Sequence, residues 1–217
     1  MIDTMSLSKV LVTGSSGGLG FYIAKYFLEK GHAVVLHGRN KEKLNKINEN
    51  FCNKGSQSNF IIGDLSSTKD IKKIAEYAIE EKVKILINNA GLICPGLEFS
   101  KITNKIIHTM IDVNLKAPIL LLNALQDHIH QVININSMVG MESKVNRTMY
   151  ASSKWGLRGF SDSLKKEDVK YNILDVYPTN IKTWQDRENA MEIDFVVEKI
   201  YNSMIDGKTE LILDGRK

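Results

Sequence analysis

Short apolar runs rich in β-branched residues recur along the chain, and most are followed by a stretch with helical spacing. A strand that is apolar at nearly every position is buried on both faces, which is typical of a parallel sheet covered by helices on both sides. Parallel strands need right-handed crossovers, so the alternation predicts a doubly wound, three-layer α/β fold with about seven strands. The predicted strands are Lys9–Thr13, Ala33–Leu36, Asn59–Ile62, Val83–Ile87, Gln131–Ile135, Asn172–Tyr177 and Glu210–Leu213.

The stretches between these runs predict the helices. A serine at position 66 or 67 is the expected N-cap of the third helix. We find no internal linker, repeat or low-complexity segment, and 217 residues suit one well-cored domain, so residues 1–217 are predicted to form a single domain. The predicted helices are Phe21–Lys30, Lys41–Phe51, Ser66 or Ser67 to Glu81, Thr103–Leu125, Met149–Leu164 and Asp194–Met204.

Composition and charge exclude several classes of protein. The apolar run Ala117–Leu122 is far shorter than the roughly 18 residues of a membrane span, and Met1–Ser8 lacks the basic region of a signal peptide. The net charge of +4 is spread over lysines interleaved with acids, which argues against a nucleic-acid surface. Cys52 and Cys94 form no metal-ligand spacing. A cytoplasmic protein without a bound metal is expected.

A glycine-rich turn, Thr13–Gly20, joins the first predicted strand to the first predicted helix. Glycines permit a tight turn and let backbone approach phosphates, while the helix N-terminus offers free N–H groups and partial positive charge. These properties suit a dinucleotide pyrophosphate. The alternative is a flexible Gly/Ser turn without a ligand, but its position after the first strand of a βαβ unit favours the phosphate site.

Four motifs in order resemble those of the short-chain dehydrogenase/reductase family. Thr13–Gly20 is similar to its T-G-x-x-x-G-x-G cofactor turn, and Asn88–Gly91 to its N-N-A-G motif. Ser137 follows the fifth predicted strand, and Tyr150 with Lys154 reproduces Y-x-x-x-K. The resemblance covers roughly Lys9 to Thr183 and implies a Rossmann-like, NAD(P)-dependent oxidoreductase.

Tyr150 and Lys154 are four residues apart on a predicted helix, so their side chains project from one face. A nearby ammonium favours the tyrosinate, and a tyrosine tuned in this way can exchange a proton with a carbonyl or alcohol oxygen. The alternative for an isolated pair is an amphipathic helix with a surface tyrosine and lysine. The glycine-rich turn predicts a bound dinucleotide cofactor, and hydride transfer with that cofactor gives the pair a chemical role.

The resemblance implies roles for further residues. Ser137 would orient the substrate oxygen, Lys154 would also hold the nicotinamide ribose, and Asn114 would anchor a proton-relay water. The alternatives are a cap or turn serine at Ser137 and a helix-interior polar group bonded to backbone at Asn114. The resemblance predicts cofactor contacts from Gly14, Ser16, Gly18, Leu19, Gly20, Arg39, Asp64, Leu65, Asn88, Ala90, Gly91, Tyr150, Lys154, Pro178, Ile181 and Thr183.

The second predicted strand leads to Arg39, with no acidic residue from Ala33 to Lys41. NAD-selective enzymes commonly place a carboxylate there, whereas an arginine suits the 2′-phosphate of NADP. Ser16 is a candidate second contact, and the alternative for Arg39 is a solvated loop charge. The pattern favours NADP(H) over NAD(H), and the family resemblance places Asp64 beside the adenine.

Two departures from the family pattern stand near the C-terminus. Thr179 replaces the glycine that usually follows Pro178, and the substrate-covering segment near 179–195 is short. Substrate-lining and ordinary packing roles are equally open for Leu92, Met138, Met141 and Trp184. The short segment favours an open site or one completed by a partner subunit, and the family implies a homodimer or homotetramer in which the helices around Asn114 and Tyr150 pair.

The leading functional hypothesis is an NADP(H)-dependent reductase or dehydrogenase acting on a small-molecule carbonyl or alcohol. A cofactor-binding sensor on the same fold is the runner-up, and the intact Tyr150/Lys154 pair argues against it. Sugar-nucleotide epimerisation or dehydration is a third hypothesis. Proteins of that branch usually have a longer C-terminal substrate domain, and 217 residues leave no room for one.

Overall fold

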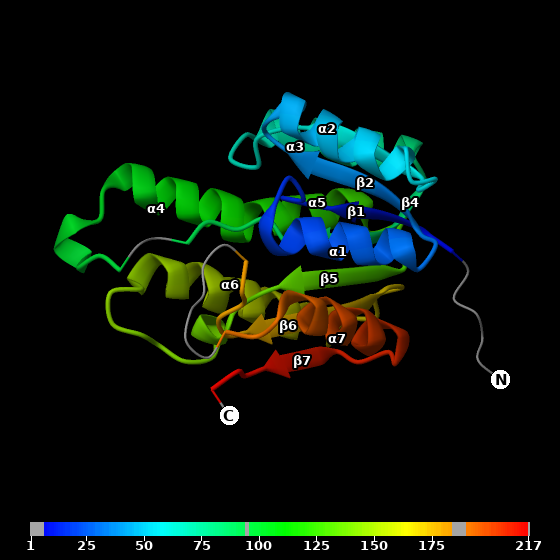
Figure 1. The fold of residues 1–217 in the computed structure, drawn as a ribbon. Coiled ribbons are helices and arrows are strands. Elements are labelled where there is room, and N and C mark those ends of the chain that lie inside the picture. The colour runs from blue at the N-terminus through cyan, green and yellow to red at the C-terminus, as the bar shows by residue number, and fades with distance from the viewer. Residues whose placement is uncertain (1–6, 94–95, 184–189, 217) are drawn as a thin grey trace.

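The structure is a computed structural model that describes residues 7–93, 96–183 and 190–216. Seven parallel strands form one sheet in the order β3-β2-β1-β4-β5-β6-β7 (Figure 1). The order reverses between β1 and β4, and this switch point is where open α/β sheets bind ligands. The predicted fold class is confirmed. The strands are β1 (Lys9–Val12), β2 (Ala33–Gly38), β3 (Ser58–Ile62), β4 (Val83–Asn88), β5 (Gln131–Ile135), β6 (Asn172–Pro178) and β7 (Glu210–Leu213).

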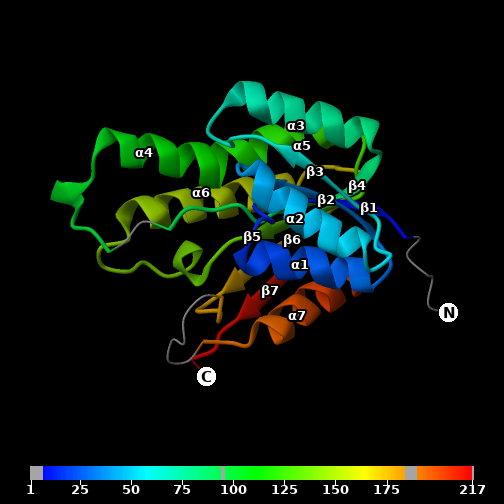
Figure 2. The ribbon, with the colours of Figure 1, turned by 45° about the horizontal axis from the view of Figure 1, so that its top comes forward.

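Helices cover both faces of the sheet (Figure 2). One layer contains α1 (Gly18–Glu29), α2 (Lys41–Cys52) and α7 (Ile193–Ile205). The other contains α3 (Thr68–Glu80), α4 (Asn104–Ile111), α5 (Ala117–Leu125) and α6 (Thr148–Leu164), with short turns η1 (Phe99–Lys101), η2 (Asp112–Lys116) and η3 (Met138–Gly140). Ser67 caps α3 by accepting a hydrogen bond from Asp70 N at 3.3 Å, one of the two predicted caps.

The central strands explain the continuous apolar runs. Val10, Leu11 and Val12 of β1 are all fully buried, but they pack alternately against the two helical layers. Side chains on a strand point to opposite faces in turn, so each layer needs its own apolar set. None of the helices within the described ranges combines the length and hydropathy of a membrane span.

The predicted single helix Thr103–Leu125 is interrupted. Its middle, η2, is a π-helical turn between α4 and α5. A single π-turn adds one residue, and the apolar residues on either side of it still recur every three or four positions, so the pattern predicts one continuous helix. Asn114 lies inside η2 and is buried. Such turns are frequent at functional sites.

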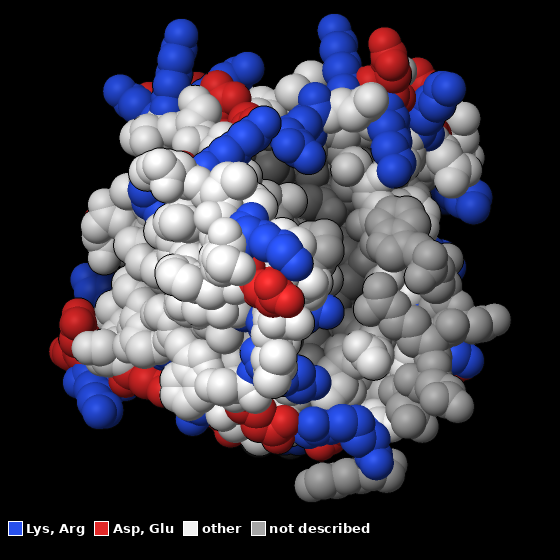
Figure 3. All heavy atoms as spheres, turned by 90° about the vertical axis from the view of Figure 1, so that its left-hand side faces the viewer, with Lys and Arg blue, Asp and Glu red and all other residues white. Residues whose placement is uncertain are grey.

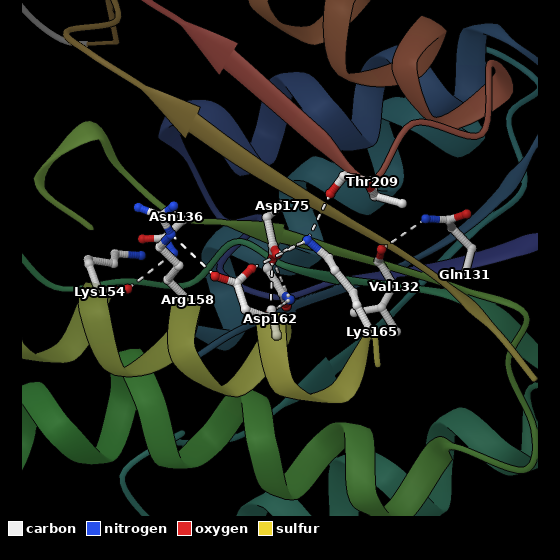
Figure 4. Close-up of polar contacts among 11 residues, drawn as sticks. Gln131, Val132, Asn136, Lys154, Arg158, Asp162, Lys165, Asp175 and Thr209 are labelled. Atoms are coloured by element: carbon white, nitrogen blue, oxygen red, sulfur yellow. Dashed lines mark hydrogen bonds and ion pairs between the residues drawn. The ribbon is translucent and has the colours of Figure 1, made fainter. Parts of the chain in front are cut away.

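A chain of buried polar side chains links β4, β5, β6 and α6 (Figure 4 shows its Asp175 end). Asn88 Nδ2 donates to Asn134 Oδ1 at 2.9 Å, and Asn134 Nδ2 donates to Asp175 Oδ1 at 3.0 Å. Ser161 Oγ donates to the same carboxylate at 2.9 Å. Asp175 is fully buried, and Lys165 Nζ reaches its other oxygen at 2.6 Å from a side chain 20% exposed. This ion pair is what lets a carboxylate lie in the core.

We expect Lys165→Met to lower the free energy of unfolding by about 3 kcal/mol, because the Asp175 carboxylate is then buried without a counter-charge. Adding Asp175→Asn should recover most of that loss, since an amide keeps polar contacts and carries no charge. Urea denaturation measures both effects. Lys166→Met, at the exposed neighbouring position, is the control. Equal losses in the two lysine variants would contradict the prediction.

Candidate active site

A cavity of about 710 Å³ lies at the carboxyl ends of the strands, on the side where α4 and α6 extend past the sheet (Figure 1). It is hollowed into the face shown in Figure 3, with lysine and arginine side chains around it. Its walls come from the turns after β1, β2, β3, β4, β5 and β6. Parallel strands bring all these turns to one edge, so residues far apart in sequence meet there.

The glycine-rich turn is held by the segment after β4. Asn89 Nδ2 donates to Thr13 O at 2.8 Å and to Gly14 O at 3.3 Å. Thr13 Oγ1 accepts from the backbone N–H groups of Asn89 and Ala90, both at 3.0 Å. A Cβ on Gly20 would lie 2.4 Å from Asn89 Nδ2 and 2.5 Å from Gly14 O. Only glycine therefore fits at position 20, and Gly14 has a φ of 67°, which also favours glycine.

His37, at the end of β2, supports the same turn from the other side. Its Nδ1 accepts from Gly14 N at 3.2 Å, and its Nε2 lies 3.2 Å from Gly63 O. Burial lowers the pKa of His37 to about 4, so the ring is neutral at pH 7. The neutral ring accepts at Nδ1 and donates at Nε2, which matches both contacts.

Tyr150 and Ser137 meet at the cavity. The Ser137 hydroxyl hydrogen-bonds the phenol of Tyr150, and it also accepts from Val139 N at 3.2 Å as the N-cap of η3. Burial raises the pKa of Tyr150, while the Ser137 hydrogen bond and the Arg147 charge act in the opposite direction. The sequence-based expectation that Lys154 draws this pKa down is wrong for the protein alone, because desolvation of the phenol outweighs the nearby positive charges.

Lys154 is almost fully buried beside Tyr150. Its Nζ lies 5.9 Å from the centre of the Tyr150 ring and donates to Ile135 O at 2.8 Å. Burial lowers the pKa of Lys154 to about 8, so the ammonium persists at pH 7. Tyr150 and Lys154 thus project from one face of α6, as their spacing predicts.

Asn114 does not line the cavity; it holds the segment that does. Its Oδ1 accepts from Leu92 N at 2.7 Å, and its Nδ2 donates to Leu92 O at 2.9 Å and to Ser153 Oγ at 3.2 Å. The side chain thereby joins η2 to the segment after β4 and to α6. A buried asparagine bonded to backbone is one of the two alternatives that the sequence left open.

Most predicted contact residues lie around this cavity. Asn88 is the exception among the predicted cofactor contacts: its side chain is buried in the polar chain beneath the site, with Oδ1 unpaired, and the neighbouring Asn89 faces the cavity. Leu92 and Met138 line the cavity, Met141 does not, and Trp184 is outside the described residues. The predicted residues that line it are Gly14, Ser16, Gly18, Leu19, Gly20, Arg39, Asp64, Leu65, Ala90, Gly91, Ser137, Tyr150, Lys154, Pro178, Ile181 and Thr183.

The cavity contains cations that the sequence analysis missed. Lys43 lies at the Arg39 end, Lys144, Arg147 and Arg216 also line the cavity, and the charge of Arg147 acts on Tyr150. Lys43 lies in the first turn of α2, which begins two residues after Arg39, so its place in the sequence was a usable signal. Arg216 gave no signal, because its place depends on a contact with Glu142, 74 residues earlier.

Thr179, where the family usually has glycine, brings the C-terminal residues to the cavity. Its Oγ1 accepts from Gly215 N at 2.9 Å, and its backbone N donates to Leu213 O at 2.9 Å. Arg216 then donates two hydrogen bonds to Glu142, at 2.9 and 3.2 Å, and three to Asp214, one of them from its backbone N. The threonine thus ties β7 and the residues after it to the end of β6.

Comparison with known proteins identifies the family. The family model described as short chain dehydrogenase matches residues 8–192. Nodulation protein G of Rhizobium sp. (strain N33) is 36% identical over 172 residues, covering 76% of this chain and 69% of that protein. The 3-oxoacyl-(acyl-carrier-protein) reductase FabG of Rickettsia bellii (strain RML369-C) is 32% identical over 212 residues, covering 92% and 83%. A solved metagenomic short-chain oxidoreductase in complex with NADP has a TM-score of 0.83 at 27% identity, covering 96% and 97%. The chain belongs to the short-chain dehydrogenase/reductase family, a family of oxidoreductases.

The buried ammonium of Lys154 predicts a pH-dependent stability. An unfolded lysine has a pKa of about 10.4, and the folded value is about 8. Between these values unfolding takes up a proton, so raising the pH stabilises the native protein. We expect Lys154→Met to raise the free energy of unfolding by about 3 kcal/mol below pH 8, and this gain to shrink as the pH approaches 10.

Urea denaturation at pH 6.5 and pH 10 measures this difference. Lys69→Met, at an exposed position of α3, is the matched control and should show no pH-dependent gain. If the stability of Lys154→Met relative to the wild type is the same at both pH values, the lowered pKa of the buried Lys154 ammonium is contradicted.

Proposed function

We propose that the protein is an NADP(H)-dependent reductase or dehydrogenase that acts on a carbonyl or alcohol. The observation that carries the proposal is the hydrogen-bonded Tyr150 and Ser137 hydroxyls at the cavity, next to the buried ammonium of Lys154. A protonated phenol, a second hydroxyl and a nearby positive charge are what reduction of a carbonyl requires from the protein.

The cavity suits a dinucleotide with an extra phosphate. The turn from Gly14 to Gly20 offers backbone N–H groups at the start of α1, and a side chain at Gly20 would disrupt it. Arg39 and Lys43 line the cavity just after β2. The strand itself, Ala33–Gly38, has no carboxylate that would bind the ribose hydroxyls of NAD and repel a 2′-phosphate. The NADP complex of a solved relative that is 27% identical supports this choice. We assign the pyrophosphate to the glycine turn and the 2′-phosphate to Arg39 and Lys43.

The chain's own groups supply the proton chemistry. NADPH, when bound, supplies the hydride. In reduction, the Tyr150 hydroxyl donates its proton to the carbonyl oxygen, and Ser137 hydrogen-bonds the same oxygen. The raised pKa of Tyr150 keeps the phenol protonated at pH 7. Lys154 stabilises the phenolate left behind, and Asn114 fixes the Leu92 segment, which packs against the cluster that contains Tyr150.

A non-catalytic NADP(H) sensor is the second candidate. A sensor requires only the residues that bind the nucleotide. It does not require a buried lysine such as Lys154, whose desolvation lowers its pKa to about 8. A destabilising buried charge beside a tyrosine is typical of a catalytic site. We therefore prefer the enzyme. The homodimer or homotetramer and the cytoplasmic location stay predictions.

Tyr150→Phe should lower kcat for NADPH-dependent carbonyl reduction by about 10²–10⁴-fold, because the proton donor is lost. NADPH binding, measured by fluorescence titration, should change little. The assay follows NADPH absorbance with a panel of ketones, aldehydes and 3-oxoacyl thioesters. Tyr171→Phe, another buried tyrosine, at the opposite end of the sheet, is the control. Turnover by Tyr150→Phe at the wild-type rate would contradict the proposed role of Tyr150. NADPH binding by the wild type without turnover of any carbonyl would favour the sensor.

Arg39→Ala and Lys43→Ala should each weaken NADPH binding by about ten- to a hundredfold and leave NADH binding nearly unchanged, because each removes a charge-assisted contact to the 2′-phosphate. Lys41→Ala, on the same helix but outside the cavity lining, is the matched control. The cofactor assignment fails if NADH binds the wild type more tightly than NADPH does.

A further inference from the structure

Asn136, the residue before Ser137, joins the end of β5 to helix α6 through its side chain. Its Oδ1 accepts a hydrogen bond from Ser137 N at 2.9 Å, and its Nδ2 donates to Lys154 O at 3.2 Å. Figure 4 shows the second of these two hydrogen bonds, which together we call the Asn136 bridge. Asn136 is buried and lines the cavity, but both ends of its amide bind protein groups. Its role is therefore to hold other residues in place.

The bridge requires a donor and an acceptor on one short side chain. A backbone N–H needs an acceptor, whereas a backbone carbonyl needs a donor, and a neutral amide offers one of each on a planar group. A carboxylate of the same shape only accepts at pH 7, and an aliphatic side chain offers neither. The amide of Asn136 thus matches both of its partners in one orientation.

The segment that carries Asn136 is itself fixed to the sheet and to Lys154. Asn136 N donates to Val176 O of β6 at 2.8 Å. Ile135 O, one residue earlier, accepts from Lys154 Nζ at 2.8 Å. Two consecutive residues therefore hold Lys154 at its ammonium and at its backbone carbonyl, and the next residue in the chain is Ser137.

Gly140 packs against the Asn136 bridge. A Cβ at position 140 would lie 2.7 Å from Asn136 Oδ1 and 3.1 Å from Lys154 O. The first distance is too short for two non-bonded atoms, so a side chain at position 140 would displace the amide. Gly140 N also donates to Ser137 O at 2.8 Å, at the end of η3. The absence of a side chain at Gly140 is thus a condition for the bridge to form.

The hydrogen bond between Ser137 and Tyr150 cannot by itself keep these two groups aligned during the reaction. In reduction the Tyr150 phenol passes its proton to the substrate oxygen, and Ser137 binds the same oxygen, so their mutual contact is exchanged for contacts with the substrate. The Asn136 amide takes no part in this exchange and keeps its bonds to Ser137 N and to α6. Catalytic groups have to stay within about 0.5 Å of their productive positions, and the bridge supplies a constraint of that kind.

We propose that Asn136 is a positioning residue of the active site, whose amide fixes the Ser137 hydroxyl relative to Tyr150 and Lys154. The inference rests on the proposed reductase function and adds to it a residue that the four sequence motifs do not include. Because Asn136 acts through Ser137 and α6, its loss should slow the chemical step more than it weakens cofactor binding.

Asn136→Ala tests the bridge directly. We expect kcat for NADPH-dependent carbonyl reduction to fall by about ten- to a hundredfold, because the Ser137 hydroxyl is no longer held in line with Tyr150. KM and Kd for NADPH should change little. The substrate is the carbonyl of the panel that the wild type reduces fastest. Gln131→Ala, which removes another buried amide at the opposite end of β5, is the control and should lower stability without lowering kcat.

Gly140→Ala tests the same bridge from a position outside the cavity lining. The added methyl group displaces the Asn136 amide, so kcat should fall by a similar factor. In Asn136→Ala the space beside position 140 is free, so the double variant should be about as active as Asn136→Ala alone. Gly159→Ala, on α6 with no atom within 4 Å of its added Cβ, is the matched control. Thermal unfolding shows which variants are folded, and if Asn136→Ala is not, Gly140→Ala decides alone.

The outcomes separate this inference from the proposed function. Wild-type kcat in Asn136→Ala or in Gly140→Ala overturns the positioning role and leaves the reductase standing. Weaker NADPH binding at an unchanged kcat also overturns it, because Asn136 would then serve the cofactor. Losses that multiply in the double variant contradict a shared bridge. NADPH binding by the wild type without turnover of any carbonyl overturns the reductase and with it this inference.

Discussion

The site depends on the contact between the glycine-rich turn and the segment after β4. Thr13 and Asn89 join the two strands at the point where the sheet order reverses, through side chain to backbone hydrogen bonds in both directions. His37 holds the turn from β2. Because the turn is fixed by two neighbours, its N–H groups are ordered before any ligand arrives, which reduces the entropy lost on binding. The same contact leaves no room for a Cβ at Gly20.

Two buried charged side chains, Lys154 and Asp175, impose a further constraint on the structure. Lys154 is buried in the cavity wall, and its desolvation lowers the pKa of its ammonium to about 8. Asp175 is buried further along the sheet with Lys165 as its partner. The two cases differ in purpose: the Asp175 carboxylate is neutralised locally, whereas no carboxylate hydrogen-bonds Lys154 among the contacts of the described residues. An uncompensated buried charge lowers stability, and such charges cluster at functional sites.

The sequence was informative where local chemistry decides the structure. Continuous apolar strands, glycine spacing and the four-residue step from Tyr150 to Lys154 depend on neighbours in the chain, and the predicted fold is confirmed. It was uninformative where position depends on packing. Whether Asn88 or Asn89 faces the cavity depends on the last alternation of side chains along β4, and the π-turn at Asn114 lies within a stretch whose apolar spacing predicts one continuous helix. The pKa of Tyr150 depends on burial, which its spacing from Lys154 does not report.

Thr179 shows how one departure from a family pattern reorganises a site. A glycine there has no side chain to hold the residues after β7, whereas the threonine hydroxyl accepts from Gly215 N. That bond brings Arg216 to Glu142, in the segment that also carries Lys144 and Arg147. The residues after β7 therefore supply part of the cavity wall, next to the end of β6. A substitution at a position next to the predicted cofactor contacts thus also fixes residues of the C-terminal segment at the cavity wall.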